Sequence, residues 1–299
     1  MSTNHPHRHL FRSIGAALVA ALGLGVLAVA AGPASASSNS EVTKPVPAQD
    51  VYVAMGDSFT AGTGTGLPDY DDANCQRSTL SYPALVTDER PNTQLTFVAC
   101  GFGVTTESFL DQVEALDQST DFVTLTLGGN DLGFAQLAGT CIGGTEGQCL
   151  GLAAMTEQYI ENELPGQLDT AYAAVRGRVH KAEVIVVGYP RFYADDFVPC
   201  MQAYGITVPE AVALNDLVEL LDGVIGERAE AAGFTYVSTV QPFTGHDMCA
   251  SAPWINGFFA PTELDRYHPT AAGYEDGFTP LVLEAMETRE PSVSQVHGR

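Results

Sequence analysis

Short apolar runs alternate with longer segments of helical spacing along most of the chain. Five runs bounded by turn residues predict strands over Val51–Met55, Gln94–Ala99, Phe122–Leu127, Val184–Gly188 and Phe234–Ser238. Between them, apolar residues at every third or fourth position predict helices over Leu152–Val179, Pro209–Ala232 and from Thr270 or Ala271 to about Glu287. Pro165 should break or kink the first of these helices.

Strands that alternate with helices favour parallel pairing. We therefore predict a three-layer α/β/α fold, with a mostly parallel central sheet and helices on both faces. In such sheets ligands bind at the carboxyl ends of the strands.

The N-terminal segment has a different pattern. Arg8 and Arg12 precede an apolar run over Ile14–Ala31, which is followed by Gly32-Pro33 and by the small-x-small triplet Ala34-Ser35-Ala36. We interpret residues 1–36 as a signal peptide cleaved near Ala36, although a retained membrane anchor is the alternative. The expected organisation is then a mature N-terminal lead over 37–50, one folded domain over 51–289 and a polar tail over 290–299.

The charge of the chain narrows its partners. It has 36 acidic and 13 basic residues, a formal net charge of −23, and loss of Arg8 and Arg12 with the leader makes the charge more negative. That excess argues against nucleic acid and anionic membrane surfaces as partners. No second long apolar run follows the leader, so we expect no stable membrane insertion.

All six cysteines lie after the leader, and an even number in an exported chain indicates three disulfides. Spacing favours one pair, Cys141 with Cys149, because the short loop between them closes at low entropic cost. A zinc site is the competing interpretation, but no Cys-x-x-Cys or Cys-x-x-His spacing occurs, and we predict no metal and no cofactor.

Nucleophilic catalysis by serine needs a histidine base, and few histidines are candidates. His5, His7 and His9 leave with the leader, His297 lies in the tail, and His180 ends a charged helix. Of the remaining two, His246 and His268, only His268 has a carboxylate three residues upstream in a loop-like segment. Asp265 could therefore orient the Nδ1 atom of His268, although Asp265 could equally cap a turn.

Three predicted strands end in residues suited to an ester-cleaving site. The first strand turns on Gly56 and presents Ser58, which by itself could be an ordinary helix cap. The third ends in Gly128-Gly129-Asn130, whose amide could donate to an oxyanion but which also suits a plain turn. A glycine loop over 101–103 follows the second strand, and Gly62–Gly66 reads as a flexible substrate-facing loop.

In combination, Gly-Asp-Ser, the glycine loop, Gly-x-Asn-Asp and Asp-x-x-His-Pro resemble the four blocks of the SGNH hydrolases, also called GDSL esterases and lipases. The resemblance runs from Val51 to about Ala285 and implies a flavodoxin-like fold. It implies that Ser58 is the nucleophile, that His268 is the base with Asp265 as its orienter, and that the oxyanion hole consists of Ser58, Gly103 and Asn130.

The six cysteines resemble those of the secreted three-disulfide branch of this family. That branch implies the sequential pairs Cys75–Cys100, Cys141–Cys149 and Cys200–Cys249. The glycine loop carries an extra residue, so Gly101 competes with Gly103 for the oxyanion role, and alignment on Val104-Thr105-Thr106 favours Gly103. Some members replace the triad aspartate by a backbone carbonyl, but because Asp265 is present we predict a complete triad.

The expected function is a secreted carboxylic ester hydrolase that works through an acyl-enzyme on Ser58 as a monomer. A set of phenylalanines near the site could line a pocket for fatty acyl esters: Phe59, Phe102, Phe134, Phe258 and Phe259. The alternatives are an acetyl-polysaccharide esterase and a non-catalytic secreted binding protein. His246 matches the branch in Gly-His-Asp before Cys249, and either shapes the pocket wall with Trp254 or supports the bridged loop.

Overall fold

The computed structural model describes residues 49–66, 75–194 and 199–288. The expected signal peptide, nearly all of the N-terminal lead and the polar tail lie outside the described residues, so those boundaries stay predictions. Among the described residues, none of the helices has the length and hydrophobicity needed to cross a bilayer.

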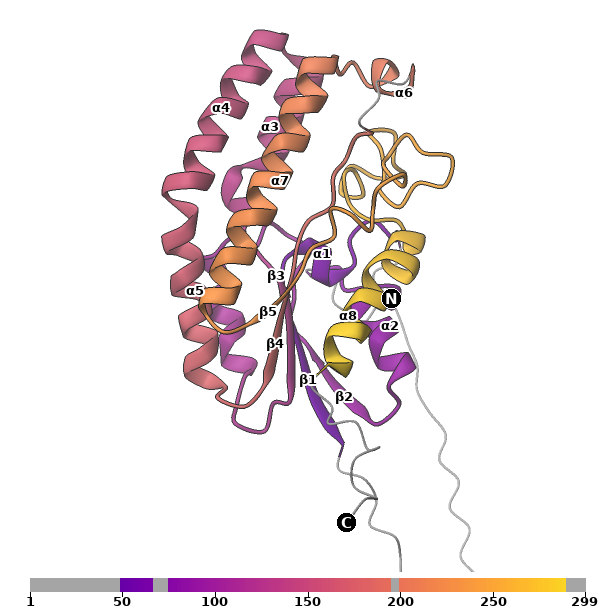
Figure 1. The fold of residues 1–299 in the computed structure, drawn as a ribbon. Helices are drawn as coiled ribbons and strands as arrows, with labels where there is room; N and C mark the ends of the chain where they lie inside the picture. The colour runs from indigo at the N-terminus through magenta and orange to yellow at the C-terminus, as the bar shows by residue number, and fades with distance from the viewer. Residues whose placement is uncertain (1–48, 67–74, 195–198, 289–299) are drawn as a thin grey trace, which may run out of the picture. The chain divides into compact units, whose positions relative to one another are not determined.

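A five-stranded parallel sheet forms the centre of the domain (Figure 1), in the order β2-β1-β3-β4-β5. All five predicted strands are present, and their ends lie within two residues of the predicted ends. The strands are β1 Asp50–Gly56, β2 Thr93–Phe97, β3 Phe122–Thr126, β4 Glu183–Val187 and β5 Thr235–Val237. The central strand β3 is fully buried, as its continuous apolar and threonine run requires of a strand covered on both faces.

Helices cover both faces of the sheet, so the predicted three-layer fold is confirmed (Figure 1). The short helix η1 (Ser108–Ala115), α5 (Leu164–Arg178) and α7 (Val208–Ala231) lie on one face, and α2 (Tyr82–Glu89) and α8 (Thr279–Glu287) on the other. The remaining helices are α1 (Ser58–Ala61), η2 (Asn130–Leu132), α3 (Phe134–Gly143), α4 (Glu146–Asn162), α6 (Pro199–Ala203) and the π-helical η3 (Gly273–Phe278).

Local sequence explains where the long helices begin and end. The predicted break at Pro165 is confirmed, because α4 ends at Asn162 and Pro165 lies in the first turn of α5, where its missing N–H costs nothing. Thr207 and Glu210 form a capping box at the start of α7, with the side chain of Glu210 accepting from the Thr207 backbone N–H at 2.8 Å.

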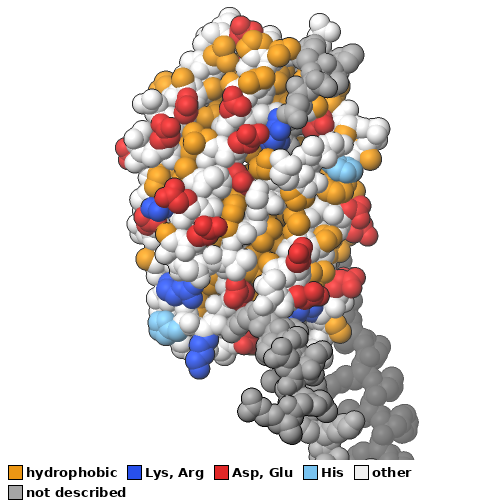
Figure 2. Space-filling model, in the orientation of Figure 1, with side chains coloured by type: hydrophobic (Ala, Val, Ile, Leu, Met, Phe, Trp, Pro, Cys, Tyr) orange, Lys and Arg blue, Asp and Glu red, His pale blue; other side chains and the backbone are white. Residues whose placement is uncertain are grey.

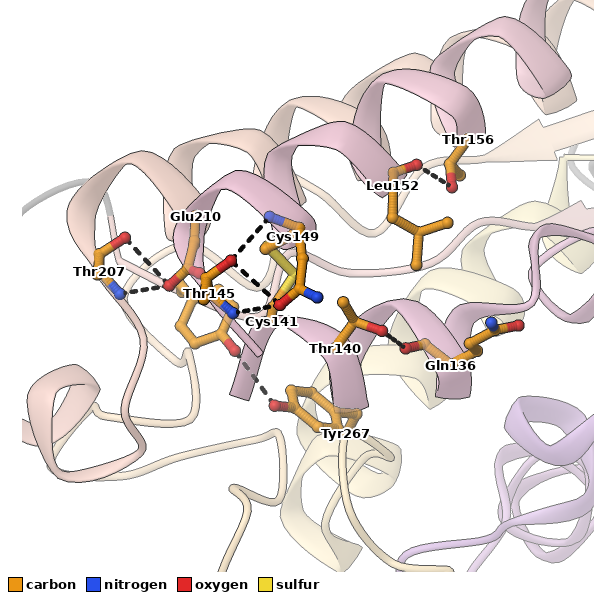
Figure 3. The surroundings of a disulfide bond; sticks show 12 residues. Gln136, Thr140, Cys141, Thr145, Cys149, Leu152, Thr156, Thr207, Glu210 and Tyr267 are labelled. Carbon is orange, nitrogen blue, oxygen red and sulfur yellow. Dashed lines mark hydrogen bonds between the residues drawn. A yellow bond between two sulfur atoms is a disulfide. The ribbon is translucent and has the colours of Figure 1, made fainter. Parts of the chain in front are cut away.

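The structure contains three disulfides, and all three pairs implied by the family resemblance are confirmed. Cys141 lies on α3 and Cys149 on α4, so this bond fastens two helices rather than closing a flexible loop, as Figure 3 shows. Thr145 and Gln148 form a second capping box at the turn between these helices.

Candidate active site

Ser58 lies where β1 gives way to helix α1. Gly56 ends the strand with a φ of +110°, and a Cβ atom there would meet the backbone oxygen of Thr126 at 2.4 Å, so this turn requires glycine. Asp57 caps α1 by accepting from the N–H of Phe59 at 2.9 Å. The turn thus brings Ser58 to the carboxyl end of the sheet, as the sequence indicates.

The structure brings Ser58 and His268 together from opposite ends of the chain. The Oγ atom of Ser58 lies 2.7 Å from Nε2 of His268. The Nδ1 atom of His268 lies 2.9 Å from the carbonyl oxygen of Arg266. A carbonyl only accepts hydrogen bonds, so Nδ1 carries the hydrogen and Nε2 is free to accept from the serine hydroxyl.

The expected contact between Asp265 and Nδ1 of His268 does not form in the structure, and the carbonyl of Arg266 takes that place. The Asp265 carboxylate accepts instead from the hydroxyl of Thr262 at 2.8 Å. The reason is the turn between them: Tyr267 has a φ of +61°, and the N–H of His268 donates to the carbonyl of Asp265 at 3.1 Å. This tight turn directs the Arg266 carbonyl, rather than the carboxylate, at the imidazole.

Burial sets the charge state of the candidate base. Desolvation lowers the pKa of His268 to about 4, against the smaller opposing effects of the Arg266 carbonyl and the charge of Asp265. The imidazole is therefore neutral at neutral pH, the form that accepts a proton.

Asn256 holds the loop that carries His268, and the sequence contained no signal for it. Its Nδ2 atom donates to the carbonyl oxygens of Gly64 at 2.9 Å and of His268 at 3.1 Å. A Cβ atom at Gly64 would lie 2.8 Å from Cβ of His268. The first part of the glycine loop over 62–66 is thus packed against the histidine loop, which corrects our interpretation of it as a flexible substrate-facing segment.

The candidate oxyanion donors lie on the loops that follow β2 and β3. Asn130 lines the cavity next to Ser58, and its Nδ2 atom donates one hydrogen to the carbonyl of Val104 at 3.0 Å. Gly101 donates its N–H to the carbonyl of Cys75 at 2.7 Å, so it has no N–H left for a substrate. Gly103 is exposed in a left-handed turn and does not line the cavity, so its oxyanion role stays a prediction.

A buried hydrogen-bonded group behind the nucleophile was not anticipated from the sequence. The hydroxyl of Tyr189 donates to Asp57 at 2.5 Å and accepts from the N–H of Gly129 at 3.0 Å. Burial raises the pKa of Asp57 to about 7, although the hydrogen bonds from Tyr189 and Phe59 oppose the shift. The Gly-Asp-Ser and Gly-Gly-Asn motifs flag two of these positions, but nothing in the sequence links Tyr189 to them.

A cavity of about 330 Å³ opens beside Ser58 and His268 and extends between α3 and α7. Its wall is mainly apolar, and Thr156 of α4 also reaches it. Three of the five expected phenylalanines line it (Phe59, Phe134 and Phe258). Phe102 and Phe259 do not line it, and they are 47% and 72% exposed. Aliphatic residues of the two helices also line it, among them Leu137, Ala138, Ile142, Leu214, Leu217, Val218 and Leu221.

His246 lies away from this cavity. Its ring stacks on Trp254 with centroids 3.7 Å apart, and Nδ1 lies 2.9 Å from the carbonyl oxygen of Ala252. Neither aromatic ring lines the cavity, so the geometry favours the second interpretation of His246, as a support of the loop that the Cys200–Cys249 bond holds.

Known proteins resemble this chain in sequence and fold. The model of the GDSL-like lipase/acylhydrolase family matches residues 54–275. A lipase from Streptomyces rimosus is 38% identical over 78% of this chain and 86% of that protein, and lipase 1 from Streptomyces coelicolor is 35% identical over 87% and 95%.

Two solved structures have the same architecture. A phospholipase A1 from Streptomyces albidoflavus NA297 superimposes with a TM-score of 0.75 at 37% identity, covering 80% of this chain and all of that one. The extracellular lipase from Streptomyces rimosus gives a TM-score of 0.75 over 79% and 99% of the two chains. With its serine and histidine joined at the carboxyl edge of a parallel sheet, this chain belongs to the GDSL-like lipase/acylhydrolase family.

Proposed function

We propose that this protein hydrolyses fatty acyl esters of lipids through an acyl-enzyme formed on Ser58. The main support is the 2.7 Å distance between Oγ of Ser58 and Nε2 of His268, beside a mainly apolar cavity. A hydrogen bond of this length to a neutral imidazole suits removal of the hydroxyl proton during attack.

The reaction follows from the positions of these groups. Ser58 Oγ attacks the ester carbonyl carbon as its proton passes to Nε2 of His268, and the carbonyl oxygen becomes an oxyanion. The alcohol leaves with that proton, and water repeats the sequence on the acyl-enzyme. The Arg266 carbonyl stabilises the imidazolium through Nδ1–H in both steps.

Asn130 and the backbone N–H groups of Ser58 and Gly103 are the proposed oxyanion donors. The second amide hydrogen of Asn130 is not needed for its bond to Val104, and the residue lines the cavity next to the nucleophile. Asn130 is held in place by its bond to Val104 and needs no reorganisation as charge develops, and one such donor contributes about a hundred- to a thousandfold in turnover.

The cavity supports a fatty acyl group over an acetyl group. An acetyl group needs little of the available 330 Å³, whereas the aliphatic lining between α3 and α7 suits a hydrocarbon chain. Similarity to proteins described as lipases and as a phospholipase A1 also supports a lipid ester as the substrate. The intact Ser58–His268 pair disfavours a non-catalytic binding protein.

We expect this activity outside the cell. Three disulfides persist only where the compartment is oxidising, which agrees with the leader pattern over 1–36. We propose that the mature protein is extracellular and acts as a monomer. Size-exclusion chromatography with light scattering would test the oligomeric state.

Ser58→Ala tests the proposal directly. We expect loss of hydrolysis of p-nitrophenyl butyrate and palmitate to near background, with an unchanged melting temperature. Ser119→Ala, at an exposed serine far along the chain, is the matched control and should keep full activity. Near wild-type turnover by Ser58→Ala would overturn the assignment, and higher activity on acetylated xylan than on palmitate would replace the lipid substrate by a carbohydrate ester.

A further inference from the structure

The buried hydroxyl of Tyr189 joins two strand ends that carry different parts of the site. Tyr189 follows β4, Asp57 follows β1, and Gly129 follows β3. The hydroxyl donates to Oδ2 of Asp57 at 2.5 Å and accepts from the Gly129 N–H at 3.0 Å. Each partner immediately precedes a residue of the proposed chemistry, since Ser58 follows Asp57 and Asn130 follows Gly129.

The Gly129 N–H fixes the direction of these two hydrogen bonds. An N–H can only donate, so the Tyr189 oxygen accepts there and directs its own hydrogen at Oδ2 of Asp57. Burial raises the pKa of Tyr189 well above its ordinary value, so the hydroxyl keeps its hydrogen. One oxygen atom therefore serves both strand ends.

The ring of Tyr189 is held as tightly as its hydroxyl. Tyr189 is 5% exposed and meets the ring of Phe59 edge to face, with centroids 5.0 Å apart. On the other side, a Cβ atom at Gly129 would lie 2.9 Å from its Cζ atom, so the glycine lets the backbone pass directly against the ring. Close packing on both sides leaves the hydroxyl little room to shift.

We propose that Tyr189 is a positioning residue, which holds the Gly129–Asn130 segment at the distance from Ser58 that oxyanion stabilisation requires. The inference rests on the proposed function of Ser58 and Asn130. Tyr189 lines the same cavity as Ser58 and Asn130, but its hydroxyl is bound to Asp57 and Gly129 and acts through these two residues, which precede Ser58 and Asn130 in the chain. Electrostatic stabilisation is sensitive to small displacements, so loosening this link should slow the chemical step more than substrate binding.

Tyr189→Phe removes the oxygen and keeps the ring. We expect kcat for p-nitrophenyl butyrate to fall by roughly ten- to a hundredfold with KM within about twofold of wild type. Tyr172→Phe is the matched control: Tyr172 is equally buried, and its hydroxyl has no hydrogen-bond partner among the described residues. This control should leave kcat and KM unchanged.

Asp57→Asn is the second variant and tests the other end of the link. The Phe59 N–H and the Tyr189 hydroxyl bind separate carboxylate oxygens of Asp57, and asparagine replaces one of these two acceptors by an NH2 group, which can only donate. The same selective loss of kcat is expected. This variant keeps the question open to test even if Tyr189→Phe is too unstable to assay.

A double-mutant cycle with Asn130→Ala separates positioning from general destabilisation. If Tyr189 acts through the oxyanion segment, Tyr189→Phe should cost much less in the Asn130→Ala background than in wild type. Equal losses in both backgrounds, or equal changes in kcat and KM, would overturn the inference. Failure of the proposed function has a different signature, because Ser58→Ala would then retain activity.

Discussion

At the scale of single residues, the carbonyl oxygen of Arg266, not a carboxylate, faces Nδ1 of the candidate base His268. Asp265 is present and only three residues from His268, yet its carboxylate is bound to Thr262. The left-handed conformation of Tyr267 turns the intervening peptide so that the Arg266 carbonyl lies 2.9 Å from Nδ1. The proposed site is therefore a serine–histidine pair whose imidazole is oriented by the main chain.

This geometry predicts a modest effect of Asp265→Asn. The substitution keeps the shape of the side chain and leaves the Arg266 carbonyl in place, so we expect kcat to fall by less than about tenfold. Loss of an aspartate that orients the histidine in a triad costs about ten-thousandfold. Steady-state kinetics with p-nitrophenyl butyrate would distinguish the two, with His268→Ala as the inactive reference. A thousandfold loss of kcat in Asp265→Asn would instead show that the Asp265 carboxylate acts as the third member of a triad.

The burial of His268 predicts an unusually acidic limit to activity. The base must be neutral, and its pKa is lowered to about 4, so activity should persist below the ordinary histidine pKa of about 6.5 and disappear as pH falls through about 4. The measurement is kcat/KM from pH 3.5 to 8, with each sample returned to pH 7 to exclude unfolding. An acid limb centred at 6.5 that persists in Asp57→Asn would contradict the lowered pKa of His268, whereas a limb near 7 that this variant abolishes would report Asp57, whose pKa burial raises to about 7.

At the scale of elements, α3, fastened to α4, forms one side of the cavity beside Ser58. α3 presents Leu137, Ala138 and Ile142 to the cavity, and the Cys141–Cys149 bond fastens its C-terminal half to α4. Figure 3 shows this bond beside the Thr145 capping box. Because α7 closes the other side, the width of the cavity depends on the spacing between helices rather than on the sheet.

Ala138→Phe should shorten the accepted acyl chain. Ala138 is 4% exposed and lines the cavity, so a ring there occupies space that a long chain needs. We expect kcat/KM for p-nitrophenyl palmitate to fall at least tenfold, while the value for acetate stays within about twofold. Ala154→Phe, at an exposed position of α4, is the control. Parallel losses on both esters would mean that the acyl group binds elsewhere.

At the scale of the whole molecule, three disulfides cross-link the domain, and acidic side chains are spread over its surface (Figure 2). The three bonds span 25, 8 and 49 residues of sequence, and the longest fastens the start of α6 to the loop that contains His246. Figure 2 shows acidic side chains spread over the visible face with apolar side chains between them. Spread charge of this kind suits solubility more than recognition of a polyanion.

Loop length predicts which of two disulfides stabilises the fold more. Removing Cys200–Cys249 by paired alanines should lower the free energy of unfolding by about 4 kcal/mol, against about 2.5 kcal/mol for Cys141–Cys149, because the longer loop gains more entropy when released. Urea unfolding followed by circular dichroism gives both values. A smaller loss for the Cys200–Cys249 pair would show that native packing, not chain entropy, dominates.

Local sequence patterns were sufficient to predict most helices and strands, and to predict that motifs far apart in the chain meet at one site. Apolar runs and turn residues placed all five strands, and the four motifs placed Ser58, Asn130 and His268 at one edge of the sheet, because the carboxyl ends of parallel strands meet there. Spacing favoured the Cys141–Cys149 pair, and the other two disulfide pairs followed from the family resemblance. None of this required knowledge of side-chain contacts.

The orientation of His268, the Tyr189 link and the shape of the cavity depended on contacts between residues far apart in the chain. The choice between Asp265 and the Arg266 carbonyl followed from one backbone angle at Tyr267, which packing imposes against local preference. Tyr189 and Asn256 meet their partners only after β4 and the histidine loop have packed. Periodicity identifies which residues are buried in each element, whereas the angles and spacings between elements follow from how all the side chains pack together.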